Sequence, residues 1–158
     1  SIGNLKSLKE LHLANNRLEK NIPHSIGGSS MTQLKHLDLS SNSIQGTIPY
    51  ELGSLTTLSS LNLSWNLLVG ELPHELSNLQ TMVELDVSHN NLGGPLISEL
   101  SSTMFLTKLK LNDNHFSGEV PREIGDLLHL DELWLNNNNF QSTLPSEISK
   151  LEGLGKIY

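Results

Sequence analysis

The side chains best suited to chemistry in this 158-residue sequence are histidines and carboxylates placed two residues apart. Glu10 and His12 form one such pair, and His36 and Asp38 form another. Imidazole and carboxylate groups are good metal ligands, so the four residues are a conceivable site for one ion. Residues two apart on a strand are separated by about 6.6 Å, however, and sharing an ion would need strained reaches. We therefore predict solvated polar pairs, Glu10 with His36 and His12 with Asp38, and no metal site.

Catalytic signatures are missing from the rest of the sequence. Cysteine is absent, which excludes thiol catalysis and Cys-bound zinc within these residues. The nucleophile elbow, the phosphate-binding loop, the zinc-protease helix and the dinucleotide-binding glycine pattern do not occur. Carboxylates such as Glu84 and Asp86 are predicted on an open surface, where nothing would exclude water or shift a pKa strongly. We predict no enzyme activity and no cofactor.

The elements that must position these side chains follow a period of 24 residues. An asparagine marks each repeat unit, and leucines flank it in one frame, as Leu61, Leu63 and Leu68 flank Asn66. Five of the six prolines lie seven residues after one of these asparagines. The first unit is two residues longer, and its extra pair falls in the loop-like Gly-Gly-Ser-Ser run at 27–30. The series consists of Asn16, Asn42, Asn66, Asn90, Asn114 and Asn138.

Each unit predicts its own local structure. The leucine alternation, as in Leu61-Asn62-Leu63, is typical of a short strand with one buried face. The asparagine that follows can satisfy backbone groups in a tight turn, so we expect a structural asparagine ladder inside the stack. The proline then begins a short helical turn at a position where its missing N–H costs nothing. One unit cannot bury its leucines alone, but stacked units can.

The unit resembles the plant-type leucine-rich repeat, most clearly in residues 55–78 (LTTLSSLNLSWNLLVGELPHELSN), and the resemblance covers essentially the whole chain. It implies an α/β repeat fold: a right-handed solenoid with a concave parallel β-sheet and short 3-10 or irregular convex segments. We predict that residues 1–158 form a single solenoid segment of about six 24-residue repeats plus partial ends. Neither end carries a polar cap, so we expect a fragment of a longer solenoid whose ends are covered by missing repeats or neighbouring chains.

The repeat register alone places strand side chains in lateral rows on the concave face, about 4.8 Å apart. Glu84 and Asp86 lie beside Lys108 and Lys110, which predicts cross-strand ion pairs worth at most about 1 kcal/mol each, or a mixed-charge recognition patch. A third lateral row includes Asn15, Ser41, Trp65, His89, Asp113 and Asn137. Leucine fills the core, so the two tryptophans either bind a partner or cover an adjacent repeat. The predicted ligand-binding residues are Trp65, Asp86, Lys108, Lys110, Glu132, Trp134 and Tyr158.

Charge narrows the choice of partner. The net charge of −7 argues against nucleic acid, whose affinity depends on clustered Lys and Arg. No Lys or Arg occurs between Lys35 and Lys108, where seven acids lie, so a basic partner would be steered there. No apolar run approaches the roughly 18–20 residues of a membrane helix. Asn62-Leu63-Ser64 is the one N-glycosylation sequon and is consistent with secretion.

Three functions stay open at this point. The resemblance and the open sheet predict a protein- or peptide-recognition module, the extracellular repeat region of a receptor-like protein or kinase, secreted or on the outer face of the plasma membrane. A structural scaffold subunit within a larger assembly is the second. The third is a secreted inhibitor of cell-wall-degrading enzymes, similar to polygalacturonase-inhibiting proteins. Sequence beyond residue 158 would distinguish them, since a membrane helix or a kinase domain would support the first.

Overall fold

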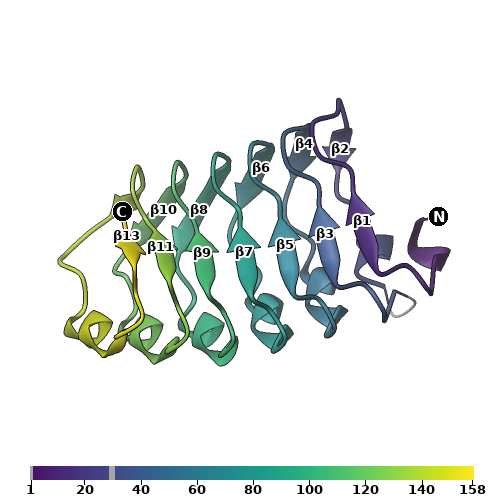
Figure 1. The fold of residues 1–158 in the computed structure, drawn as a ribbon. Coiled ribbons are helices and arrows are strands. Elements are labelled where there is room, and N and C mark those ends of the chain that lie inside the picture. Colours follow the sequence, from purple (N-terminus) through teal and green to yellow (C-terminus); the bar gives the residue numbers. More distant parts are fainter. Residues whose placement is uncertain (1, 29–30) are drawn as a thin grey trace.

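The computed structural model describes residues 2–28 and 31–158 as a row of stacked coils (Figure 1). A complete coil contributes one strand to each of two parallel sheets and one 3-10 helix. The predicted α/β solenoid with short convex helices is therefore confirmed. Within these residues no helix is both long and apolar enough to cross a bilayer.

The leucine alternation forms a parallel sheet of seven strands in the described part of the chain, ordered as in the sequence. Leu61 lies beside Leu85, and Leu85 beside Leu109, so each strand from β3 onwards pairs with its equivalent 24 residues later, and β1 pairs with β3 at an offset of 26. This register lets every coil bury the same leucine towards one core. The strands are β1 (Glu10–His12), β3 (His36–Asp38), β5 (Ser60–Asn62), β7 (Glu84–Asp86), β9 (Lys108–Lys110), β11 (Glu132–Trp134) and β13 (Lys156–Ile157).

A second parallel sheet, which the sequence did not predict, follows the asparagine of each coil and lies behind the first in Figure 1. In β6 the residues Leu67, Leu68 and Val69 are all apolar, although only Leu68 is buried. The strict alternation of apolar and polar residues that predicts a strand is therefore missing. Stacking of the coils brings these backbone segments side by side. Over the described residues its strands are β2 (Glu19–Asn21), β4 (Ser43–Gly46), β6 (Leu67–Gly70), β8 (Asn91–Pro95), β10 (His115–Gly118) and β12 (Asn139–Phe140).

Short 3-10 helices close the coils opposite the turns (Figure 1). Proline directly precedes most of them with φ near its fixed value, for example −65° at Pro49, as the repeat predicts. Ile97 takes this place before η5, because Pro95 falls two residues early. Across residues 2–28 and 31–158 they are η1 (Ile2–Asn4), η2 (His24–Ile26), η3 (Tyr50–Ser54), η4 (His74–Asn78), η5 (Ser98–Ser102), η6 (Arg122–Asp126) and η7 (Ser146–Lys150).

Four units carry a glycine at a left-handed backbone position, which Lys20 and Ser142 hold in the first and sixth units, and this leads to a test. Gly118 has φ +77°, and Ser142, at the same place in the next coil, has φ +78°. A left-handed conformation costs an L-residue about 1–2 kcal/mol. We expect Ser142→Gly to raise the free energy of unfolding by about 0.5–1 kcal/mol, and Gly118→Ala to lower it similarly. A Cβ at Gly118 meets no atom within 4 Å, so backbone strain alone would act. Urea midpoints measure both changes; equal midpoints for wild type and both variants would contradict the assignment.

Candidate ligand-binding face

The open face of the seven-stranded sheet is formed by the side chains that flank the buried leucine of each strand. Glu84, Lys108 and Glu132 are direct lateral neighbours in one row. Asp86, Lys110 and Trp134 are neighbours in the next row. The open face therefore carries the residue order that the 24-residue spacing predicts.

An aromatic-lysine cluster lies where β9, β11 and β13 meet, and we define it as Lys110, Glu132, Trp134, Lys156 and Tyr158. The rings of Trp134 and Tyr158 lie 4.2 Å apart with planes tilted by 33°. Lys110 Nζ lies 5.7 Å from the centre of the Trp134 ring, within range of a cation–π contact. Trp134 Nε1 donates to Glu132 Oε2 at 3.2 Å. The indole is thus partly buried by its neighbours but stays on the open face.

Lys156, from the next coil, binds Glu132 of this cluster. Lys156 Nζ donates to Glu132 Oε1 at 2.8 Å. The bonded Lys156 ammonium, followed by the donation from Trp134, holds the pKa of the Glu132 carboxyl below its ordinary value. The same pair raises the pKa of Lys156. Glu132 is charged at neutral pH, and because its pKa is lowered, its bonds to Lys156 and Trp134 are lost only as the pH falls through that lowered value.

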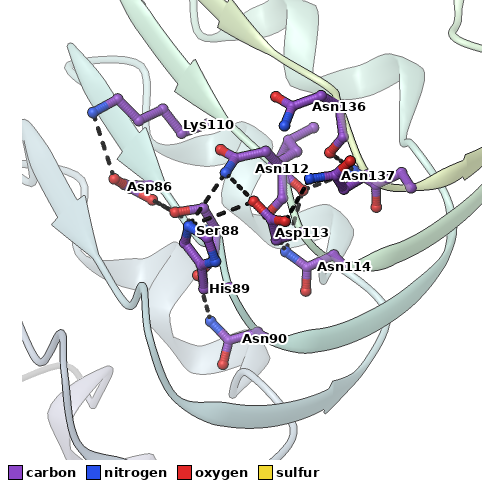
Figure 2. Close-up of polar contacts among 12 residues, drawn as sticks. Asp86, Ser88, His89, Asn90, Lys110, Asn112, Asp113, Asn114, Asn136 and Asn137 are labelled. Carbon is purple, nitrogen blue, oxygen red and sulfur yellow. Dashed lines mark hydrogen bonds and ion pairs between the residues drawn. The ribbon is translucent and has the colours of Figure 1, made fainter. Parts of the chain in front are cut away.

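Lys108 and Lys110 face acids of the preceding strand. Lys108 Nζ lies 3.9 Å from Glu84 Oε1. Lys110 Nζ lies 3.7 Å from Asp86 Oδ2, as Figure 2 shows. Both separations exceed those of charge-assisted hydrogen bonds, and both lysines remain partly exposed, so the pairs are weak. The ammonium groups are free to engage another anion at little cost.

Three coils share an internal lock that the sequence reasoning missed. Asp86 Oδ1 accepts the backbone N–H of Ser88 at 3.0 Å and its hydroxyl at 2.6 Å (Figure 2). Asn62 with Ser64 and Asp38 with Ser40 repeat this geometry. The lock fixes one carboxylate or amide oxygen and leaves the other side-chain atom available. Asn62, the sequon residue, belongs to β5, the third strand of the seven, and lies on the open face.

Residues of the third row do not extend the strands; they form a left-handed turn, which we call the turn row. His89 stacks on Trp65 with ring centres 3.8 Å apart and planes 21° apart. His89 Nε2 lies 3.5 Å from Asp113 Oδ2, and Asn137 Nδ2 donates to Asp113 Oδ1 at 2.7 Å (Figure 2). Donation from Asn112 first, then from Asn137, lowers the pKa of Asp113. With φ of 53–56°, the turn row comprises Asn15, Ser41, Trp65, His89, Asp113 and Asn137.

Beneath the turn row lie the asparagines of the 24-residue series. Asn90 Nδ2 donates to the carbonyls of Leu63, Val87 and Ser88 at 3.0, 3.1 and 3.2 Å. Its Oδ1 accepts the N–H of Leu68 at 3.0 Å. Each asparagine from the second coil onwards thus joins two coils, whereas Asn16 bonds only to carbonyls of its own turn. The cross-coil residues are Asn42, Asn66, Asn90, Asn114 and Asn138.

The structure corrects the lateral side-chain pairing predicted for the first two strands. His12 is the lateral neighbour of Asp38, but its Nε2 lies 3.5 Å from Glu10 Oε2 of its own strand. Asp38 instead bonds to Ser40, whose N–H and hydroxyl are nearer along the chain. Among residues 2–28 and 31–158, no group of three or more His, Cys, Asp or Glu side chains is placed to hold a metal ion.

Comparison with known proteins points to one family. Models described as leucine rich repeat match residues 6–68, 78–95, 105–127 and 129–151. No curated protein sequence matches the chain at a significant level. A chain in the structure of the plant peptide hormone receptor RGFR1 in complex with RGF2 is 33% identical with a TM-score of 0.94, over 97% of this chain and 24% of that one.

Two further solved structures are similar. A chain of the Arabidopsis receptor kinase HAESA in complex with the peptide hormone IDA and the co-receptor SERK1 is 35% identical, with a TM-score of 0.88, over 95% of this chain and 25% of that one. A chain of the BIR3–SERK2 complex from Arabidopsis thaliana is 32% identical, with a TM-score of 0.75, over 85% of this chain and 71% of that one. The present chain thus spans about a quarter of the RGFR1 and HAESA matches.

Proposed function

The chain belongs to the leucine-rich repeat family, and from that premise we propose that it is a peptide-recognition segment of the extracellular part of a receptor-like protein or kinase. The family fold is a non-catalytic recognition module. Similar structures contain peptide hormones bound to receptors, which supports a peptide as the ligand class. The similarity to peptide hormone receptors supports an extracellular setting. We place the ligand on the open face, centred on Lys108 and the aromatic-lysine cluster.

One observation carries this placement: Trp134 lies on the open face although the core does not need it. The described core is filled mainly by leucine, and β11 already buries Leu133 completely. The indole instead packs between Lys110 and Tyr158 with Glu132 at its edge. An aromatic anchor bordered by charged groups has the composition of a binding hot spot. Rigid stacking also reduces the ordering cost on binding.

Trp134→Ala is expected to weaken binding of a peptide by about 2 kcal/mol or more, roughly 30-fold. Peptides are first selected from a random displayed library on the 158-residue chain, and their affinities are then measured by calorimetry. Tyr50→Ala is the matched control, since Tyr50 is 58% exposed in η3, away from the seven-stranded sheet. Equal affinities for wild type and Trp134→Ala, or a loss confined to Tyr50→Ala, would refute the placement. Unchanged urea midpoints confirm that both variants are folded.

A further inference from the structure

Trp65 occupies a backbone position that does not suit it. Its φ is +56°, a left-handed conformation that is unfavourable for a bulky residue. Asn15 and Asn137 hold the same position elsewhere in the turn row with the same φ, and asparagine tolerates that conformation. The indole is also 58% exposed, so it adds little to the core. Neither local backbone preference nor packing explains Trp65, and such outliers point to binding roles.

One face of the Trp65 ring is fixed and the other is open. His89 covers the first face at 3.8 Å, and its imidazole lies 3.5 Å from Asp113. Asp113 is itself held at 2.7 Å by Asn137, so the support extends over three coils. On the opposite side the next residue of the turn row is Ser41, whose side chain is too short to cover an indole. We call the pair the Trp65–His89 shelf, a planar surface with one free aromatic face.

The charges around this shelf select its occupant. No Lys or Arg occurs between Lys35 and Lys108, so the coils that hold Trp65 and His89 carry none. Asp38 and Asp86 lie in the strands directly before and after β5, on the same open face. Asp86 faces Lys110 at 3.7 Å, so Asp38 is the carboxylate left without a cation among the described residues. Asp38 contacts no Lys or Arg side chain of the described residues, and its Oδ1 is used by Ser40. A flat aromatic face in a negative field favours a planar cation over a neutral ring.

We propose that the Trp65–His89 shelf binds the guanidinium group of an arginine side chain in the peptide ligand. This inference rests on the proposed function and adds a second contact point to the open face. Three strand intervals separate β5 from β11, or about 14 Å across the sheet. In an extended peptide that reaches both points, the arginine and the residue that contacts Trp134 are about four positions apart.

A titration with small probes tests the shelf directly. In the 158-residue chain with Trp134→Phe, Trp65 is the only indole, and its fluorescence reports on the shelf alone. N-acetyl-arginine amide is expected to change this fluorescence saturably. The uncharged isostere N-acetyl-citrulline amide is expected to act only linearly, as it does on free N-acetyl-tryptophan amide. Equal saturation by citrulline, or tighter binding of N-acetyl-phenylalanine amide, would overturn the proposal.

Two isosteric variants separate charge from shape. Asp38→Asn removes one charge and keeps its bonds to Ser40, because Asn62 makes the same two bonds to Ser64. Asn62→Asp adds one charge in the same lock. Arginine affinity is expected to fall about two- to threefold in the first variant and to rise by a similar factor in the second. Unchanged arginine affinity in both variants would contradict the proposal.

The selected peptides distinguish failure of this inference from failure of the proposed function. Trp65→Asn places the residue type of Asn15 and Asn137 at the shelf, so the fold is retained and only the indole is lost. Arginine-containing peptides are expected to lose about tenfold in affinity to this variant, and those with arginine replaced by citrulline to lose none. Peptides that depend on Trp134 but not on Trp65 would refute the shelf and leave the proposed function standing. Saturable binding of N-acetyl-arginine amide, together with peptide binding that does not depend on Trp134, would refute the proposed function and leave the shelf standing.

Discussion

Replacing Asn90 with alanine is expected to lower the free energy of unfolding by about 3 kcal/mol, because buried backbone groups of two adjacent coils lose their partners. The two N–H groups of the amide share three carbonyl acceptors, and its oxygen accepts the Leu68 N–H. The side chain is only 6% exposed, so water cannot replace these bonds without entering the stack. Chemical denaturation followed by circular dichroism gives the change.

Asn91→Ala is the natural control for this experiment. Asn91 is the next residue along the chain, has the same side chain and is exposed in β8. Its replacement should change stability by less than about 0.5 kcal/mol. Similar losses for Asn90→Ala and Asn91→Ala would mean that the ladder does not stabilise the stack through the amide bonds described above.

A larger loss, about 3–4 kcal/mol, is expected for Leu85→Ala in β7. Leu85 is completely buried and lies between Leu61 and Leu109, so its removal leaves a cavity bordered by two other coils. The regular backbone of the stacked strands resists collapse into that space. Leu67→Ala is the comparison, because Leu67 is 47% exposed in β6 and its loss leaves no cavity. Denaturation midpoints within error of each other would show that the strand register given for β7 is wrong.

The seven-stranded sheet could be predicted because one constraint fixes it. A leucine that leaves the core in one coil loses its packing against two neighbours, so the 24-residue spacing sets the lateral pairing uniquely. The second sheet lacks such a constraint: β6 exposes the apolar Leu67 and Val69 on either side of the buried Leu68, so no apolar–polar alternation in the sequence marks it as a strand. Its pairing follows from the stacking of the coils and not from its own sequence.

The open face was predictable as a set of rows and not as a set of contacts. The spacing places Lys110 beside Trp134, and the same arithmetic extended by one coil would have found Lys156 beside Glu132. The left-handed turn row was hidden, because tryptophan, histidine and aspartate do not share a preference for that backbone. The locks formed by Ser40, Ser64 and Ser88 are visible in the sequence only once the turn geometry is known, since each depends on a backbone N–H that faces the side chain two residues earlier.

Photo-cross-linking of a selected peptide that carries a benzophenone group tests most directly whether the open face binds the ligand. The peptide is irradiated with the 158-residue chain, and the attached residues are identified by mass spectrometry. We predict cross-links to Lys108, Lys110, Trp134 and Tyr158, and competition by the unlabelled peptide. Cross-links confined to Leu67 and Val69 of the second sheet, or to Tyr50 in η3, would contradict a ligand site on the open face.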